Sequence, residues 1–389
     1  MNNQLMESKK NKIKNNTKFL KISALFLFTV LINNTVIAQK TEYYRHLVFR
    51  ESPFSDTRGI HQIDKSKAQE EAHYRFVYDN QNRVTEISHR IGDVVINNNN
   101  NWDSFIWFSP KMSVEYTNNQ EIRYYYNRLD RKIETHGKMY KAVFDLDKSG
   151  NRIAVKFYDK NNAPSENVWG IHNYQWKIEG KGNVIEKRFN LKGEPRPIRP
   201  NFTFYTVRLE YGDDDFLDFV HHLDKDGNRI NNTMKAAMDR IVYDNEGNFS
   251  RWMVFDKDLK PVEGNAPEFA IGEHLYDTRG NKVELRGFGV TGRNKAMPNG
   301  VARELNSYDK FNNQIETKSL DINGNTLQHV KREYSKDGRR IEWMKFIGKD
   351  RKLMLHPQAK FAAMKFIYAK DGSMSGRKFY DENLKELKR

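Results

Sequence analysis

The chain has 389 residues, with 66 Lys and Arg against 51 Asp and Glu, a formal net charge of +15, and no cysteine. The lack of cysteine excludes disulfides, catalytic thiols, thiolate metal sites and lipid attachment to a cysteine. The basic excess favours diffuse attraction to anionic glycans or envelope polymers. The sequence contains no basic run and no packed recognition motif, so we expect no nucleic-acid partner.

The N-terminus has the order of a secretory signal. Lysines precede an apolar run from Ile22 to Ile32, and small residues follow up to Ala38. We expect cleavage after Ala38, so residues 1–38 form a signal peptide and the protein is exported, to the periplasm or the extracellular space. The apolar run of about 11 residues is too short to span a bilayer, and no membrane span is expected after cleavage. The signal holds six lysines and one glutamate, so the remaining chain keeps a net charge of +10.

Two regions follow the signal. Residues 39–73 are expected to form an N-terminal cap with a short helix from Ser66 to Ala72, and residues 74–389 a β-repeat domain. The first repeat interval is longer than the others, which predicts an inserted aromatic loop at about 92–118. Loops on a rigid repeat body concentrate binding residues, whereas aromatic residues can also cap the first repeat of an array. The candidate binding residues in this loop are Trp102, Trp107 and Phe108.

A six-residue phrase, aromatic-Asp-x-x-Gly-Asn, recurs about every 33 residues, most clearly at Tyr243–Asn248 and Tyr276–Asn281. Its Asp can accept hydrogen bonds from amides two residues further on. The first residue of each copy, here called the anchor, is aromatic except at Leu146 and Ile178, and the residue types four places after each anchor tolerate positive φ. This pattern predicts a hairpin turn in every repeat. The predicted turn residues are Asn82, Asp130, Gly150, Gly182, Asp215, Gly247, Gly280, Asn312, Gly338 and Gly372.

The residues around each turn alternate as in strands. Isoleucine or valine lies seven places after many anchors and glutamate eight places after, which predicts an apolar residue facing the core beside a charged residue facing solvent. The glutamates of this series are Glu86, Glu134, Glu186, Glu284, Glu316 and Glu342. An alanine six places before several anchors indicates close approach of neighbouring repeats. These alanines are Ala72, Ala237, Ala270, Ala302 and Ala362.

We therefore expect an all-β, mainly antiparallel fold, in which hairpin or meander repeats of about 33 residues stack in an elongated array. A second turn is expected about 13 residues after each anchor. The return segment that completes each unit is either extended or a short helix, because residues such as Met234 to Met238 favour helix.

Motifs that could carry chemistry are weak. The glycine spacing of Gly287–Gly292 matches a dinucleotide loop, but no helical period follows it. Asp145–Gly150 matches the opening of a calcium loop, yet Lys156 stands where the bidentate glutamate belongs. The adjacent His221 and His222 point to opposite faces of a strand and cannot chelate one ion. We expect no metal, no cofactor and no catalytic residues, although the recurring glutamates could imitate a glycosidase pair.

The Tyr-Asp-x-x-Gly-Asn turns at Tyr243–Asn248 and Tyr276–Asn281 resemble the YD repeats of the Rhs and teneurin-like families, with a longer period of about 33. The resemblance implies a secreted or surface β-structure with a structural or binding role. The first functional hypothesis is an exported, non-catalytic scaffold that binds an envelope glycan, anionic in charge, or an envelope protein. The alternatives are a secreted hydrolase of polysaccharide and a component of a surface or toxin-delivery assembly.

Overall fold

The computed structural model describes residues 40–101, 107–180 and 182–388. The chain divides into two compact units, and the described part of the first consists of Lys40 and the turn Asp79–Arg83. In that turn the Asp79 carboxylate accepts hydrogen bonds from the amides of Gln81 and Arg83, both at 2.9 Å. The predicted signal peptide, residues 1–38, lies outside the described residues. The second unit holds Thr41–Tyr78 and Val84–Arg389.

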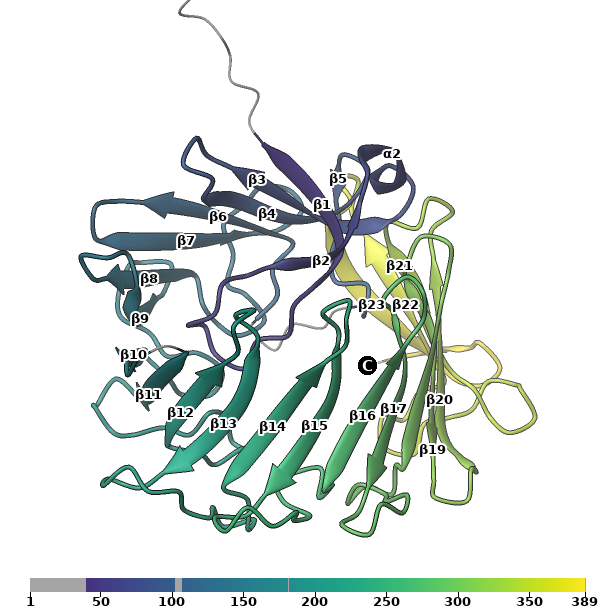
Figure 1. The fold of residues 1–389 in the computed structure, drawn as a ribbon. Coiled ribbons are helices and arrows are strands. Elements are labelled where there is room, and N and C mark those ends of the chain that lie inside the picture. The colour runs from purple at the N-terminus through teal and green to yellow at the C-terminus, as the bar shows by residue number, and fades with distance from the viewer. Residues whose placement is uncertain (1–39, 102–106, 181, 389) are drawn as a thin grey trace, which may run out of the picture. The chain divides into compact units, whose positions relative to one another are not determined.

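The second unit is an open, antiparallel β-sheet in which consecutive strands are hydrogen-bonded neighbours almost throughout (Figure 1). The exceptions are at its start, where β1 lies between β2 and β3, and at β4, which pairs with both β5 and β6. The strands are β1 (Thr41–Leu47), β2 (Gly59–Ile63), β3 (Ala72–Tyr78), β4 (Val84–Ile91), β5 (Val94–Val95), β6 (Lys111–Tyr116), β7 (Gln120–Tyr126), β8 (Lys141–Leu146), β9 (Arg152–Tyr158), β10 (Asn173–Ile178), β11 (Asn183–Phe189), β12 (Thr206–Tyr211), β13 (Leu217–Leu223), β14 (Met238–Tyr243), β15 (Phe249–Phe255), β16 (Ile271–Tyr276), β17 (Lys282–Phe288), β18 (Arg303–Tyr308), β19 (Gln314–Leu320), β20 (Thr326–Tyr334), β21 (Ile341–Phe346), β22 (Ala363–Tyr368), β23 (Met374–Tyr380) and β24 (Glu386–Leu387).

The hairpin turns adopt the conformation that the repeat pattern predicts. All ten predicted turn residues have positive φ, between 58° and 86°. In the turn that follows β14, the carboxylate of Asp244 accepts hydrogen bonds from the amides of Glu246 and Asn248, both at 2.9 Å. Second turns repeat the arrangement, as where Asp256 accepts from the amides of Asp258 and Lys260. The all-β, antiparallel hairpin fold is therefore confirmed.

The return segments are turns and extended chain, so the helical alternative is wrong for them. In the segment containing Met234, the Asn232 amide donates to the Ala236 carbonyl at 2.7 Å, and Lys235 has a φ of 67°. A left-handed residue at that position ends any helical turn. The helix expected in the N-terminal cap is shorter than predicted: α2 covers Lys65–Ala68. No helix among the described residues has the length and apolar character needed to cross a membrane.

The predicted close approach at the recurring alanines is present. The Ala237 carbonyl accepts a hydrogen bond from the His222 amide of β13 at 2.8 Å, and the Ala270 carbonyl accepts one from the Val254 amide of β15 at 2.9 Å, so each alanine lies against the last strand of the preceding hairpin. All five alanines of this series are at most 4% exposed. A larger side chain at these positions would have to displace packed neighbours.

The predicted alternation of a buried apolar residue and an exposed glutamate is wrong in the middle of the sheet. Ile153 on β9 is 42% exposed, whereas Glu186 on β11 is 1% exposed. The Glu186 carboxylate is buried because it accepts hydrogen bonds from Ser52, from the Trp176 indole at 2.7 Å and from Arg188 at 2.9 Å. A buried carboxylate with these partners loses little from its removal from water.

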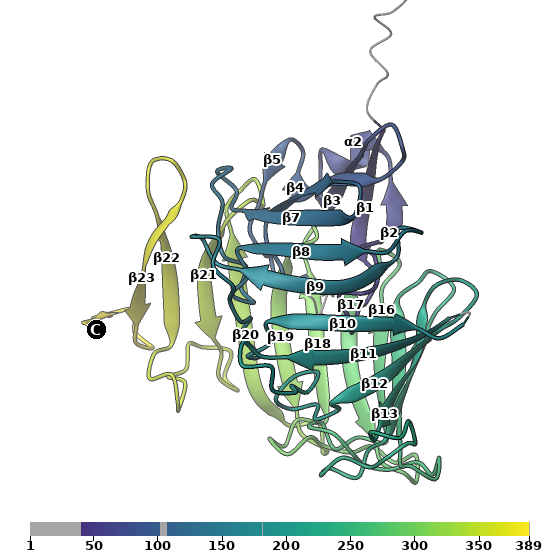
Figure 2. The same cartoon turned by 90° about the vertical axis from the view of Figure 1, so that its left-hand side faces the viewer.

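Ser52 belongs to the segment that joins β1 to β2, residues 48–58, here called the crossing segment. Its first part is buried, and it packs against strands far away in the sequence. Phe49 stacks on Phe249 of β15 with ring centroids 4.2 Å apart, and Phe54 meets Trp176 of β10 edge-on at 5.6 Å. The largest hydrophobic core lies here, among residues of β7 to β15. Figure 2 shows β7 to β13 of this set in succession. The crossing segment thus decides which face of these strands is buried.

Candidate functional site

Anchor tyrosines join neighbouring hairpins by a recurring hydrogen bond. Tyr276, at the end of β16, donates through its Oη to the carbonyl of Phe249, the first residue of β15, at 2.8 Å. The same bond joins Tyr308 to Lys282 at 2.9 Å and Tyr368 to Ile341 at 2.7 Å. Pairing between neighbouring hairpins is short: β15 and β16 pair over three residues, whereas β14 and β15 pair over six. The tyrosine therefore closes the gap where the hairpins separate.

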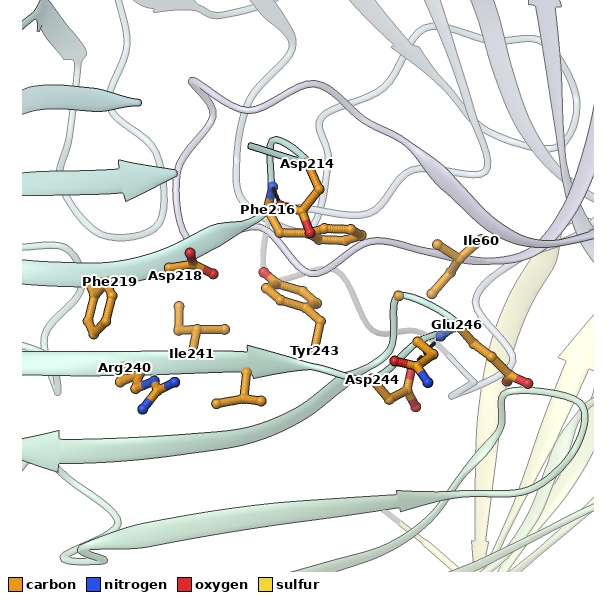
Figure 3. Close-up of a pocket in the computed structure, with 13 residues that line it drawn as sticks. Ile60, Asp214, Phe216, Asp218, Phe219, Arg240, Ile241, Tyr243, Asp244 and Glu246 are labelled. Atoms are coloured by element: carbon orange, nitrogen blue, oxygen red, sulfur yellow. Dashed lines mark hydrogen bonds between the residues drawn. The ribbon is translucent and has the colours of Figure 1, made fainter. Parts of the chain in front are cut away.

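Tyr243 of β14 departs from this pattern because of the crossing segment. Its Oη lies 3.4 Å from the carbonyl oxygen of Phe49, instead of reaching the start of β13. Pairing between β13 and β14 stops at Phe219 and Arg240, so the strands diverge beyond these residues. An open groove of about 510 Å³ lies between the diverging ends of β13 and β14 (Figure 3). Its lining residues are Ile60, Asp214, Phe216, Asp218, Phe219, Arg240, Ile241, Val242, Tyr243, Asp244, Asn245, Glu246 and Gly247.

One wall of the groove is aromatic. The rings of Phe216 and Tyr243 face each other with centroids 4.4 Å apart, as the labelled side chains in Figure 3 show. The Arg58 guanidinium lies 4.5 Å from the Phe216 ring centroid and donates to the carbonyls of Asp214 and Asp215 at 3.0 and 3.1 Å. The crossing segment thereby fixes both the ring and the loop that carries it, which preorganises this wall.

Carboxylates supply most of the groove's polar groups. The Asp214 Oδ1 and the Asp218 Oδ2 each lie 2.9 Å from the position that a Cβ on Gly212 would occupy, so at most twice that distance separates them. Burial raises the pKa of Asp218, and the charge of Asp214 raises it further, against the opposing effect of Arg240. Two carboxylates on one side of the groove favour a ligand that donates hydrogen bonds.

The groove was not predicted from the sequence. Tyr243 and Asp244 belong to the clearest copy of the motif, and they were interpreted only as turn residues. The signal that could have pointed to the groove is the local excess of acidic and aromatic residues from Asp213 to Phe219. Its meaning depends on the crossing segment, which lies more than 150 residues earlier in the chain.

The three aromatic residues predicted to form a binding site, Trp102, Trp107 and Phe108, do not form one exposed surface among the described residues. Trp107 is 5% exposed, and its indole packs against Phe157 and Trp169, with centroids 5.6 and 5.2 Å away. Phe108 is half-buried and meets the His89 ring edge-on at 5.6 Å. Trp102 lies outside the described residues. Trp107 is therefore part of the core between later strands, and ligand binding by the loop stays a prediction.

The inserted loop contains a run of five asparagines, Asn97–Asn101, which has a structural role that the sequence did not indicate. The Asn99 side-chain amide donates to the Asn313 side chain at 3.0 Å, and the Asn101 amide donates to the Asn281 side chain at 2.7 Å. Asn281 and Asn313 are the last residues of two repeat turns. The loop is therefore anchored to repeats that lie about 180 and 214 residues further along the chain.

The two adjacent histidines lie on opposite faces of β13, as predicted. The His221 ring nitrogen lies 3.1 Å from a Glu210 carboxylate oxygen, and the His222 ring stacks on Phe204 at 4.7 Å. Within the described ranges, no group of three or more His, Asp or Glu side chains could hold a metal ion.

The chain matches no family model and no curated protein. Among solved structures it is similar, at 12% identity and a TM-score of 0.33, to a chain of the Photorhabdus luminescens Tc holotoxin pore, covering 82% of this chain and 17% of that one. A TcdB2-TccC3-Cdc42 chain gives 11% identity, a TM-score of 0.29 and coverage of 88% and 23%. A porin-like protein from Bacteroides uniformis gives 12% identity and a TM-score of 0.22, and the match covers 77% of this chain and 92% of that one. The chain spans less than a quarter of the toxin chains, and we base no functional argument on these weak similarities.

Proposed function

We propose that the protein is an exported, non-catalytic β-repeat scaffold that binds a glycan in the groove between β13 and β14. The observation that carries the proposal is the groove itself, in which an aromatic wall stands beside carboxylate and guanidinium groups. Sugars present apolar C–H faces that pack on aromatic rings and hydroxyls that donate to carboxylates. Export rests on the sequence of residues 1–38 alone.

The charge of the groove narrows the class of glycan. Its lining includes four carboxylates, from Asp214, Asp218, Asp244 and Glu246, and one guanidinium, from Arg240. A carboxylated or sulfated sugar would meet net repulsion here. The groove therefore suits a neutral or amino-bearing oligosaccharide better than the anionic glycan expected from the overall charge.

The test uses residues 39–389, a glycan array and calorimetry with the glycans that the array selects. Asp218→Asn removes one acceptor charge while keeping the side-chain shape, and it should weaken binding about tenfold, because hydrogen bonds to charged groups contribute about 1.5–3 kcal/mol. Asp226→Asn makes the same change in the exposed turn that follows the C-terminal end of β13, and it should change the affinity by less than about twofold. Equal affinities for the two variants and the unaltered protein would refute glycan binding in this groove.

One observation favours a second function, hydrolysis of a polysaccharide. The Asp214 and Asp218 carboxylates lie on the same groove, each with an oxygen 2.9 Å from the position of a Cβ on Gly212, and the raised pKa of Asp218 suits a general acid. The scaffold hypothesis expects the array ligand to be recovered intact after incubation. Release of reducing ends that disappears in Asp218→Asn would instead establish the hydrolase.

A further inference from the structure

A second surface of different chemistry lies on the last strands of the sheet. Trp343 of β21 pairs with Lys365 of β22, which pairs with Lys378 of β23, so these three side chains share one face. Lys345 and Tyr380 lie on the same face, in register with Ala363 between them. Figure 2 shows the three strands side by side. We call the set Trp343, Lys345, Lys365, Lys378 and Tyr380 the Trp343 platform.

The opposite face of the same strands is the core side, which fixes the orientation of the platform. Met344, Met364 and Phe379 are in register with one another and pack in a hydrophobic cluster with Phe346 and Phe361. Because successive side chains alternate between faces, the platform side chains point away from this cluster. The platform is thus a solvent-facing surface on a fixed backbone.

The indole of Trp343 lies across the neighbouring strand. Its centroid is 5.2 Å from that of Tyr380, two strands away, and Ala363 in between is 0% exposed. The ammonium groups of Lys345 and Lys365 lie 5.4 and 5.2 Å from the indole centroid. A small residue on β22 therefore lets two aromatic rings form one apolar surface, bordered by positive charge.

The charges on the platform are not balanced. Lys345 pairs with Glu333, and Lys378 pairs with Glu386 at 2.9 Å. Lys365 forms no ion pair with any described residue, and it stands directly opposite Lys378. Like charges directly opposite each other in adjacent strands destabilise a sheet. The exposed ammonium of Lys365 is thus available to an anionic group of a ligand.

We propose that the Trp343 platform binds an anionic glycan, a polymer of sugars that carry carboxylate or sulfate groups. The sugar ring packs on the aromatic surface, and its anionic group pairs with the ammonium of Lys365, with Lys345 and Lys378 next to it. This site is separate from the acidic groove, so the protein binds two kinds of glycan through two surfaces of opposite charge.

The experiment measures retention of residues 39–389 by affinity electrophoresis in gels that contain polygalacturonate, dextran sulfate or neutral dextran. Lys365→Gln removes the charge and keeps a flexible polar side chain, and it should weaken retention by an anionic polymer about fivefold or more. Lys148→Gln makes the same change in an exposed turn and should alter retention less than about twofold. Any retention by neutral dextran should be the same for Lys365→Gln and for the unaltered protein.

Two further measurements distinguish the platform from diffuse attraction. Trp343→Leu keeps an apolar cover over Ala363 but loses the aromatic face, and it should weaken retention by polygalacturonate without lowering the unfolding midpoint by more than a few degrees. Asp218→Asn, in the groove, should leave this retention unchanged. Two results would overturn the proposal. One is an equal loss of retention in Lys365→Gln and Lys148→Gln. The other is retention by duplex DNA equal to that by polygalacturonate, together with no change of retention in Trp343→Leu.

Discussion

Two glycines at the same place in two repeats separate local from tertiary contributions to stability. Gly150 and Gly280 both have positive φ, 86° and 79°. A Cβ on Gly150 would meet no atom within 4 Å, whereas a Cβ on Gly280 would overlap the His61 ring and lie 2.8 Å from the His46 ring. The two alanine substitutions therefore share the backbone cost and differ in packing.

The magnitudes follow from these geometries. Gly150→Ala should destabilise by about 1–2 kcal/mol, the cost of a left-handed residue that carries a Cβ. Gly280→Ala should cost a further ~1–3 kcal/mol, because the buried His46 and the ring of His61 must move. Repeat proteins can unfold in parts. We would therefore combine urea denaturation with hydrogen exchange of the peptides that contain β2 and the turn between β16 and β17.

The double variant His61→Ala/Gly280→Ala completes a mutant cycle. Removing the ring should recover most of the extra cost of Gly280→Ala, and the coupling should appear as faster exchange in β2 only when the ring is present. Costs for Gly150→Ala and Gly280→Ala that agree within about 0.5 kcal/mol would show that β2 does not pack on this turn, and would refute the reasoning.

Three other predictions concern the joints and the buried charges. Tyr276→Phe should destabilise by about 1 kcal/mol, measured by urea denaturation, because its bond to the Phe249 carbonyl is lost. Glu186→Ala should cost ~3–5 kcal/mol in the same assay, since it leaves the buried Arg188 without its ion pair. Burial lowers the pKa of His274 to about 3. The neutral ring therefore contributes fully to the free energy of unfolding above the unfolded pKa of ~6.5, and this contribution is lost as the pH falls towards 3. Between pH ~6.5 and ~5 the free energy of unfolding should fall by about 2 kcal/mol less in His274→Asn than in the wild type.

Each of these has an internal control. Tyr243→Phe should cost less than about 0.5 kcal/mol, because its 3.4 Å contact with the Phe49 carbonyl is long for a hydrogen bond. Glu134→Ala removes an exposed glutamate of the same series and should be nearly neutral. Unfolding curves of wild type and His274→Asn that shift equally with pH would contradict the assignment of a neutral, buried His274.

The hairpin turns could be predicted because everything that forms them lies within six residues. The carboxylate, the amides that it accepts from and the left-handed residue of the Asp244 turn are contiguous in sequence. The same holds for the alanines: a small residue at a fixed distance from each turn reports a backbone approach that the repeat itself creates. Short-range geometry of this kind is encoded locally.

The buried face of each strand and the groove could not be predicted in this way. Glu186 is buried because the crossing segment supplies Ser52 to its carboxylate, whereas Ile153 is exposed at the β-bulge of the β8–β9 hairpin, where the register passes from Ala154 to Arg152. The groove exists because the same segment draws Tyr243 away from its usual partner.

The sequence by itself determined the period, the turns, the antiparallel hairpins and the absence of thiol chemistry, because each depends on residue type and short spacing. Tertiary structure alone decided the burial of Trp107, the anchoring of the asparagine run, the acidic groove and the Trp343 platform. These depend on contacts between residues of adjacent hairpins, or on segments more than 100 residues apart, whose mutual positions no local pattern records.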